Sequence, residues 1–74
     1  MMVQAVLNWR SLVARALEVR REEGLTQREL AALAGVTQPT VVKFEKGSTS
    51  IRVDSVLAIL HALGLAEAGD RTED

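Results

Sequence analysis

The 74-residue sequence contains no cysteine, one histidine and one proline. Without cysteine there is no disulfide framework and no thiolate ligand for a metal, and one histidine cannot build a multi-histidine metal site. No apolar run approaches the roughly 20 residues that span a bilayer. Residues 1–10 lack a basic region before their apolar stretch, so they do not resemble a signal peptide. These absences predict a cytoplasmic protein with no metal, no cofactor and no membrane contact.

Hydrophobic residues make up 47% of the sequence and charged residues 26%. This hydrophobic fraction is well above that of a disordered chain. The length allows one small domain. The net charge of −1 argues against a nucleic-acid partner at first sight. Acidic residues gather in 65–74, however, whereas residues 1–64 contain eight basic and six acidic residues, a net +2. Because binding depends on the local field at the contact face, the net charge does not exclude nucleic acid.

Apolar spacing and capping residues predict an all-α chain with short loops. Asn8 and Thr37 are suitable N-caps for two of its helices. Thr26 and Glu29 have the spacing of a capping box for a third. The predicted helices span 9–23, 27–34, 38–46 and 53–63. In the last helix the spacing favours an apolar stripe of Val53, Val56, Leu57, Leu60 and Leu63.

Two short helices joined at Gly35 have the outline of a helix-turn-helix. Ala31 is small where the second helix must cross closely, and Val36 and Val41 can pack just after the turn. The stretches Gly24-Leu-Thr-Gln-Arg-Glu-Leu-Ala31, Ala34-Gly-Val-Thr-Gln38 and Phe44-Glu-Lys-Gly47 are similar to the Xre/Cro family of phage and bacterial repressors, which are lambda-repressor-like. The resemblance covers roughly residues 12–64. It implies a compact bundle of four or five helices, and homodimers that bind palindromic operators and repress transcription.

This resemblance divides the chain into an N-terminal arm (1–8), a DNA-binding domain (9–64) and an acidic, flexible C-terminal tail (65–74). Among short family members, the segment 56–65 is similar to antitoxins that pair with kinase-like toxins, and phage repressors and restriction–modification controllers are alternatives. Those antitoxins often continue into a strand used for dimerisation. Residues 66–70 do not resemble one.

The helix over 38–46 is the predicted base-contacting element. Gln38, Val42 and Lys43 are the candidates for base contacts, because glutamine pairs with adenine, lysine with guanine and an aliphatic group with a thymine methyl. Pro39 replaces the polar residue of many family members, and a helix-start role for it is the alternative. The phosphate candidates are Gln27, Arg28, Thr40, Lys46 and Arg52. Arg28 and Lys46 are equally explained as solvated charges, and Val42 as a partly buried packing residue.

Two further interactions are expected within and between chains. Arg20 and Glu45 both face the core on the helical wheel and have opposite charges, so a partly buried ion pair is predicted. The alternative is that both extend to solvent. Aliphatic residues outside the predicted stripes, Ile51, Ile59 and Leu65, form the candidate dimer or partner surface, unless residues 65–70 fold back over them.

The sequence favours a dimeric DNA-binding repressor over an interaction protein that docks a toxin, and over an enzyme. The two binding roles can coexist in an antitoxin. No catalytic constellation is present, because Ser48 and Ser50 have no activating histidine partner and the glycines form no phosphate-binding loop. The expected partners are double-stranded DNA and a second copy of the chain, with a toxin protein as the alternative and no small-molecule ligand.

Overall fold

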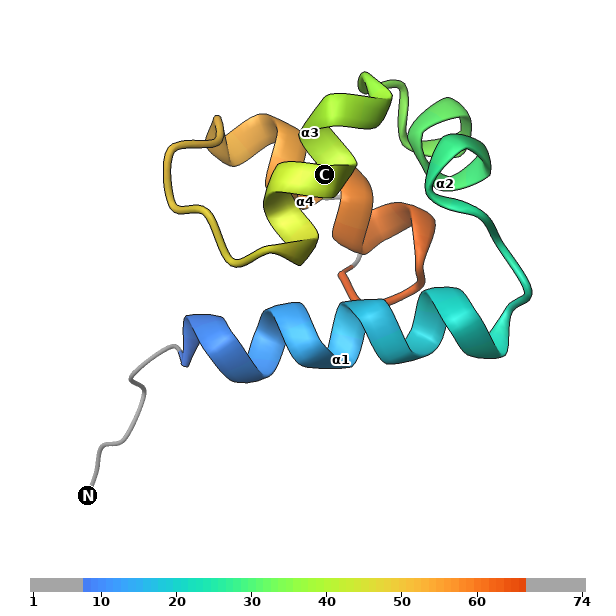
Figure 1. Cartoon of the computed structure of the whole chain (residues 1–74), viewed down its shortest axis with the longest axis horizontal. Coiled ribbons are helices and arrows are strands. Elements are labelled where there is room, and N and C mark those ends of the chain that lie inside the picture. Colours follow the sequence, from blue (N-terminus) through green and yellow to red (C-terminus); the bar gives the residue numbers. More distant parts are fainter. Residues whose placement is uncertain (1–7, 67–74) are drawn as a thin grey trace, which may run out of the picture.

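The computed structural model describes residues 8–66 and contains four helices (Figure 1). They are α1 (Trp9–Glu22), α2 (Gln27–Ala34), α3 (Gln38–Glu45) and α4 (Val53–Ala62). The described residues form no strand, so the all-α prediction is confirmed. Residues 1–7 of the predicted arm and 67–74 of the predicted tail lie outside the described residues.

Local side-chain hydrogen bonds start the helices where the sequence predicts. Asn8 Oδ1 accepts from the Ser11 amide at 3.1 Å at the start of α1. At the start of α2, the Glu29 amide donates to Thr26 Oγ1 at 3.0 Å and the Thr26 amide donates to Glu29 Oε1 at 2.8 Å. This reciprocal pair satisfies two amides that the helix itself leaves free. The starts of α1 and α2 therefore follow from local sequence, whereas α4 begins without a side-chain cap.

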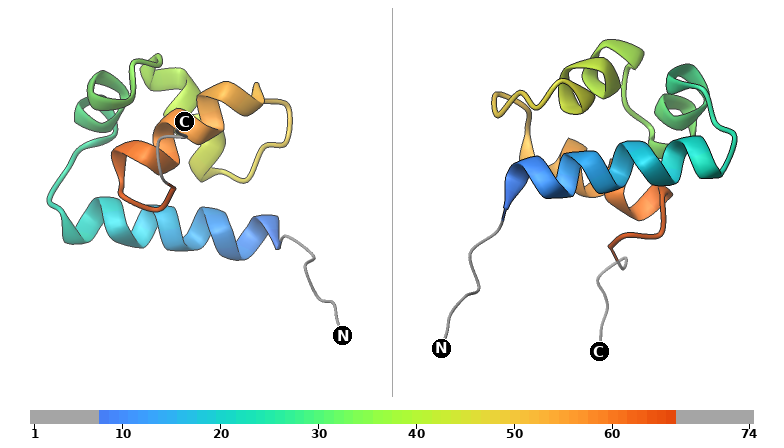
Figure 2. Two further views of the ribbon diagram at one scale, coloured as in Figure 1. Left: turned by 180° about the vertical axis from the view of Figure 1, so that it is seen from behind. Right: turned by 60° about the horizontal axis from the view of Figure 1, so that its bottom comes forward.

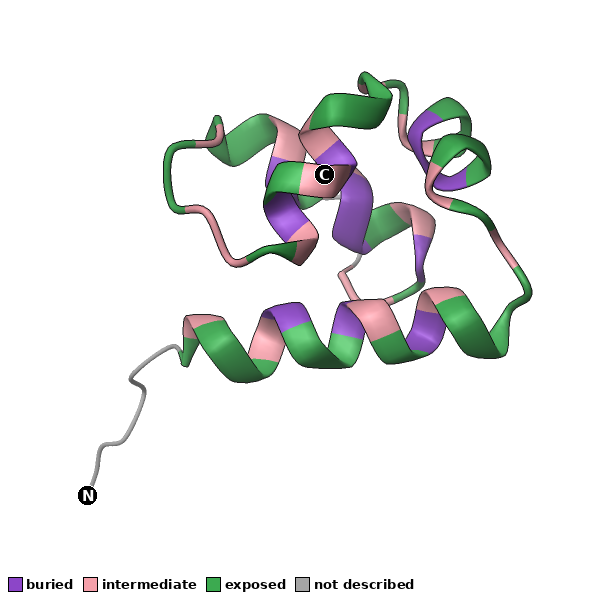
Figure 3. Cartoon of the chain, viewed as in Figure 1, coloured by how far each residue is buried: buried purple, intermediate pink, exposed green. Residues whose placement is uncertain are grey.

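Helix α1 lies along one side of the molecule, and the three shorter helices form the rest of the body (Figures 1 and 2). Among these, α2 packs against both α3 and α4. Helix α3 also contacts α1 and α4. The placement of α3 is thus determined by three neighbours, while one of its faces remains exposed at the surface (Figure 3).

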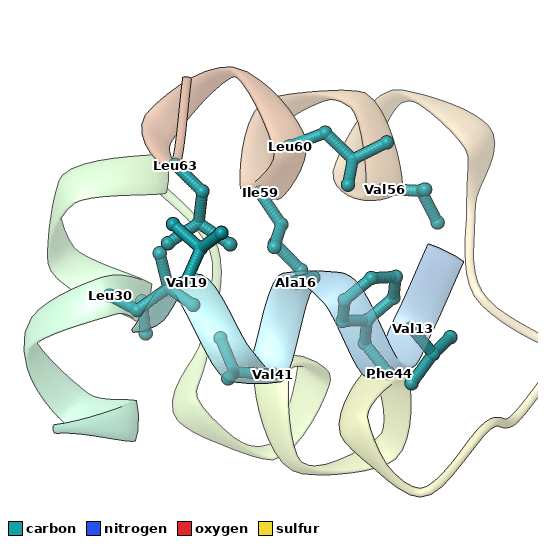
Figure 4. Close-up of a cluster of buried hydrophobic side chains, with 11 residues drawn as sticks. Val13, Ala16, Val19, Leu30, Val41, Phe44, Val56, Ile59, Leu60 and Leu63 are labelled. Carbon is teal, nitrogen blue, oxygen red and sulfur yellow. The ribbon is translucent and has the colours of Figure 1, made fainter. Parts of the chain in front are cut away.

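The core is a single cluster of aliphatic side chains and Phe44, drawn from all four helices (Figure 4). Phe44, Leu30, Ile59 and Val41 are its largest fully buried side chains. The remaining buried residues are Val13, Ala16, Val19, Ala31, Val56, Leu60 and Leu63. Within residues 8–66, no polar or charged residue is fully buried. Apolar burial of this kind is the main favourable term in folding.

The predicted apolar stripe of α4 is confirmed at Val56, Leu60 and Leu63, which are buried, and is wrong at Val53 and Leu57. Ile59, assigned to a partner surface, is fully buried and points toward Ala16 of α1 (Figure 4). Val53 and Leu57, assigned to the core, are 73% and 52% exposed. The helix is apolar on most sides, so the spacing of its residues allowed either Val53 and Leu57 or Ile59 to face the core. Packing against the other helices buries Ile59. The other two surface candidates are half-buried, and both pack against the core (Ile51, Leu65).

The ion pair between Arg20 of α1 and Glu45 of α3 is present and has two hydrogen bonds. Arg20 Nε donates to Glu45 Oε2 at 2.6 Å, and Arg20 Nη2 donates to Glu45 Oε1 at 3.2 Å. The two side chains are 12% and 7% exposed. Arg20 Nη1 also donates to the Leu25 carbonyl at 2.8 Å. A bidentate pair of this kind has a defined geometry, so it holds the end of α3 in register with α1.

Removal of one partner should strongly destabilise the fold. We expect Arg20→Ala or Glu45→Ala to lower the free energy of unfolding by about 3–5 kcal/mol, because each leaves a mostly buried charge without its partner. Replacing both by well-packed apolar residues should recover much of the loss. Arg15→Ala is the matched control. It breaks an ion pair with Glu18 whose side chains are 55% and 59% exposed, and it should change stability by about 0.5 kcal/mol or less. Denaturant titrations measure all four. Equal small effects would contradict the buried pair.

Candidate nucleic-acid interface

A tight turn centred on Gly35 joins α2 to α3. Gly35 has φ of 73°, a left-handed conformation that glycine adopts without steric cost, and the Val36 amide donates to the Ala31 carbonyl at 3.0 Å. Thr37 then caps α3 by accepting from the Thr40 amide at 3.3 Å. These bonds direct α3 away from α2 within three residues, as a helix-turn-helix requires.

Helix α3 has one buried and one exposed face. Val41 and Phe44 are fully buried and attach the helix to the core. The opposite face surrounds a shallow hollow of about 450 Å³ lined by Gln38, Pro39, Val42 and Lys43. The three predicted base contacts therefore lie together on one surface, although their roles toward DNA stay predictions. Pro39 lies beside them in addition to occupying the first turn of the helix.

Two predicted phosphate contacts lie next to this surface. Thr40 and Arg52 line a hollow of about 160 Å³ together with Lys43. The Thr40 hydroxyl lies 2.8 Å from the Thr37 hydroxyl, and Arg52 Nη2 donates to Asp54 Oδ2 at 2.9 Å. That ion pair is exposed, with side-chain exposures of 83% and 69%. Because exposed pairs are weak, Asp54 holds the Arg52 guanidinium only loosely, and the phosphate role of Arg52 stays a prediction.

The other two cationic candidates lie elsewhere on the surface. Arg28 is exposed in the first turn of α2, and Lys46 is exposed just after α3. Lys46 lines a different hollow that also includes Arg10 of α1. Arg10 was not predicted, since it is distant in sequence and only the packing of α1 beside the end of α3 brings the two cations to one surface.

Gln27, predicted as a phosphate contact, uses its amide inside the protein. Its Nε2 donates to Glu45 Oε1 at 2.9 Å. The Glu45 carboxylate therefore binds Arg20 from α1 and Gln27 from α2, while it belongs to α3. The structure thus gives Gln27 a role in joining the helices, which the sequence spacing did not indicate.

Trp9 provides a second attachment for the end of α3. Its indole Nε1 donates to the Gly47 carbonyl at 3.1 Å, and its ring meets Phe44 edge-to-face with centroids 5.6 Å apart. Such an aromatic pair contributes about 0.5–1.5 kcal/mol beyond its burial. The sequence did not predict this contact of Trp9 with the end of α3, because the only signal was a single tryptophan at the start of a predicted helix.

A family model described as helix-turn-helix matches residues 17–69. The chain belongs to this family, the Xre and lambda-repressor-like helix-turn-helix proteins. An HTH-type transcriptional regulator of Haemophilus influenzae is 33% identical over 54 residues, which are 73% of this chain and 55% of that relative. A regulator of the same kind from Methanothermobacter thermautotrophicus is 40% identical over 57 residues, 77% of each chain. The chain spans about half the length of the Haemophilus relative.

Solved structures of similar fold cover nearly the whole helix-turn-helix chain. A chain from the structure of the HipA-HipB-O2-O3 complex matches 96% of this chain and 100% of its own length, with a TM-score of 0.74 and 28% identity. A chain described as MDT Protein has the same coverage and TM-score with 27% identity. The predicted fold class is therefore confirmed.

The sequence relatives are transcriptional regulators, which is a non-enzymatic kind of function. Between residues 8 and 66 no helix has the length and apolar character needed to cross a bilayer. The same described stretch holds no group of three or more His, Cys, Asp or Glu side chains that could bind a metal ion.

Loss of the Gln27 amide should reduce stability. We expect Gln27→Ala to lower the free energy of unfolding by about 1–2 kcal/mol, because it removes a hydrogen bond to a charged, mostly buried carboxylate. Gln38→Ala is the matched control, since Gln38 is exposed, and it should leave stability within about 0.5 kcal/mol. Chemical denaturation measures both. Unchanged stability for Gln27→Ala, together with weaker binding to every duplex, would instead support the phosphate contact predicted from sequence.

Proposed function

We propose that the protein is a sequence-specific DNA-binding repressor that acts as a homodimer on a palindromic operator. The observation that supports this most directly is the division of α3 into two faces. Val41 and Phe44 hold one face in the core, and Gln38, Val42 and Lys43 lie together on the exposed face. A helix presented in this way fits the major groove of B-DNA, which is about 12 Å wide.

The exposed side chains of α3 match distinct base edges. Gln38 can bind the N6 and N7 atoms of adenine, and Lys43 can donate to guanine O6 or N7. Val42 is half-buried, and its exposed part suits a thymine methyl group. Each good contact of this kind discriminates against the wrong base by about 1–3 kcal/mol, so three of them give useful selectivity within one half-site.

Residues around α3 can position the helix on the DNA backbone. Thr40 and Arg52 lie beside Lys43, so they can bind the phosphates that flank the bases it contacts. Arg28 in the first turn of α2 and Lys46 just after α3 are further exposed cations. Contacts to phosphates determine the register of a protein on the duplex without reading its sequence. Loss of a phosphate contact should therefore weaken binding to every sequence, whereas loss of a base contact should change the sequence preference.

A homodimer is expected because one helix-turn-helix can contact only half of a palindromic operator. A single helix-turn-helix contacts one half-site, and a twofold dimer places two recognition helices in successive major grooves. Ile51 and Leu65 remain the predicted dimer or partner residues, and both are half-buried. Ile59 no longer belongs to this surface, because it is fully buried.

A second candidate function is an antitoxin that binds a toxin protein and regulates its own operon. The chain of similar fold in the HipA-HipB-O2-O3 complex favours this role, since that chain is found in an assembly of several named components. DNA binding and protein binding are compatible in one molecule. A protein that only docks a partner would bind duplex DNA weakly, without the steep loss of affinity with salt that phosphate contacts cause.

Variants of α3 should change sequence preference. We expect Gln38→Ala and Lys43→Ala each to weaken binding to the operator by about 1–3 kcal/mol and to relax discrimination at one position per half-site. Binding of a duplex library selected on the wild type measures both effects. Arg28→Ala is the matched control: it should weaken all sequences alike and reduce the slope of log K against log salt by about 1. An unchanged base preference for Lys43→Ala would remove it from the base contacts.

The dimer should be visible in solution and on DNA. We expect sedimentation equilibrium across micromolar concentrations to detect a monomer–dimer equilibrium, shifted to dimer by a palindromic duplex. The two α3 helices should lie one DNA turn apart, roughly 34 Å. A species that stays monomeric both free and on the palindrome would contradict the repressor proposed here.

A further inference from the structure

An apolar groove of about 470 Å³ lies between the start of α1, the loop before α4 and α4 itself. Trp9 and Leu12 line it from α1, Ile51 from the loop, and Val53 and Leu57 from α4. Figures 1 and 2 show this loop at the same end of the molecule as the start of α1. Val53 is 73% exposed and Leu57 is 52% exposed. Exposed apolar surface that is gathered in one place favours a covering partner.

The groove lies next to the proposed DNA-contacting surface. Ile51 lines both the groove and the polar hollow that contains Thr40, Lys43 and Arg52. Two recognition helices roughly 34 Å apart each lie about 17 Å from the twofold axis between them. The contact between the two copies must therefore be on a surface close to α3. The groove meets this requirement, because it shares Ile51 with the hollow beside that helix.

The lining of the groove suits contact with an identical surface. A twofold interface uses the same patch on both copies, so the patch must be complementary to itself. Like charges brought together in such a contact would repel each other. Among the described residues, no charged side chain lines the groove, and Thr49 is the one polar residue in its lining. Two copies of this apolar surface can therefore meet without repulsion.

We propose that a second copy of the chain covers the Trp9–Leu57 groove about a twofold axis. This interface rests on the homodimer proposed above, and it adds Trp9, Leu12, Val53 and Leu57 to the predicted dimer residue Ile51. The exposed apolar side chains of α4 then have a structural reason, since each copy removes those of the other from water.

The proposed interface is connected to the end of the recognition helix through Trp9. The Trp9 ring meets Phe44 edge-to-face, and its indole donates to the Gly47 carbonyl just after α3. Trp9 is also part of the groove wall and is half-buried in the single chain. A second copy over Trp9 would exclude water from this hydrogen bond and strengthen it. Dimer formation would thereby support the end of α3.

Charged substitutions in the groove test the interface by sedimentation equilibrium of the free chain. We expect Val53→Asp and Leu57→Asp each to raise the Kd of the dimer at least about tenfold, because the contact would bury an unpaired charge. Val53 is in the first turn of α4, where an added carboxylate suits the helix dipole, so this variant should fold. Leu33→Asp is the matched control, since Leu33 is 64% exposed on α2 and outside the groove lining. It should change the Kd by less than about twofold.

The fluorescence of Trp9 reports whether the groove itself is covered. Trp9 is the one tryptophan of the chain, so its emission can be followed in the wild type without a label. We expect the emission to move to shorter wavelength as protein concentration rises, in proportion to the fraction of dimer, because the indole loses contact with water. Leu57→Asp should show no such shift over the same concentrations, whereas Leu33→Asp should behave as the wild type.

The outcomes separate the groove from the proposed repressor. Groove variants that dimerise with the wild-type Kd would overturn the groove interface and leave the homodimer intact. A wild-type dimer whose Trp9 emission does not change with concentration would also overturn it, because another surface would then join the copies. A free wild-type chain that stays monomeric would overturn it as well, since an apolar contact needs no DNA. A chain that dimerises through the groove but binds no duplex DNA would contradict the repressor alone.

Discussion

The Glu45 carboxylate is the interaction on which the placement of the recognition helix depends. It lies at the end of α3, accepts two hydrogen bonds from Arg20 of α1 and accepts a third from Gln27 of α2. Arg20 is in turn bound to the Leu25 carbonyl between α1 and α2. One mostly buried anion thus joins three helices. A mostly buried charge is costly unless its hydrogen bonds are satisfied, so this arrangement favours one relative orientation of α1, α2 and α3.

The same helix is also held at its C-terminal end by aromatic packing. Phe44 is fully buried, and Trp9 contacts both its ring and the Gly47 carbonyl that follows α3. These attachments use the inner face of α3. Its outer face carries Gln38, Val42 and Lys43, which line a hollow at the surface. A binding helix fixed by its neighbours loses little conformational freedom on binding, which favours affinity.

Local sequence accounts for most of the backbone. The caps at Asn8, Thr26 and Thr37 and the left-handed glycine at Gly35 involve contacts between residues close in the chain, so their chemistry is visible in the sequence. The buried face of α3 was predictable because Val41 and Phe44 lie three residues apart, a spacing that places both on one side of a helix. Helix α4 is apolar on most of its sides, and burial was predicted wrongly at Val53, Leu57 and Ile59.

The sequence by itself determined the four helices, the turn at Gly35 and the side of α3 that carries the candidate base contacts. It also paired Arg20 with Glu45, since two opposite charges on inward faces have few other ways to be satisfied. Only the tertiary structure decided that Ile59 is buried, that Gln27 binds Glu45 and that Trp9 binds Gly47. Each of these three contacts joins residues that are distant in sequence. They depend on the angles at which the helices cross, which the spacing of residues along the chain does not determine.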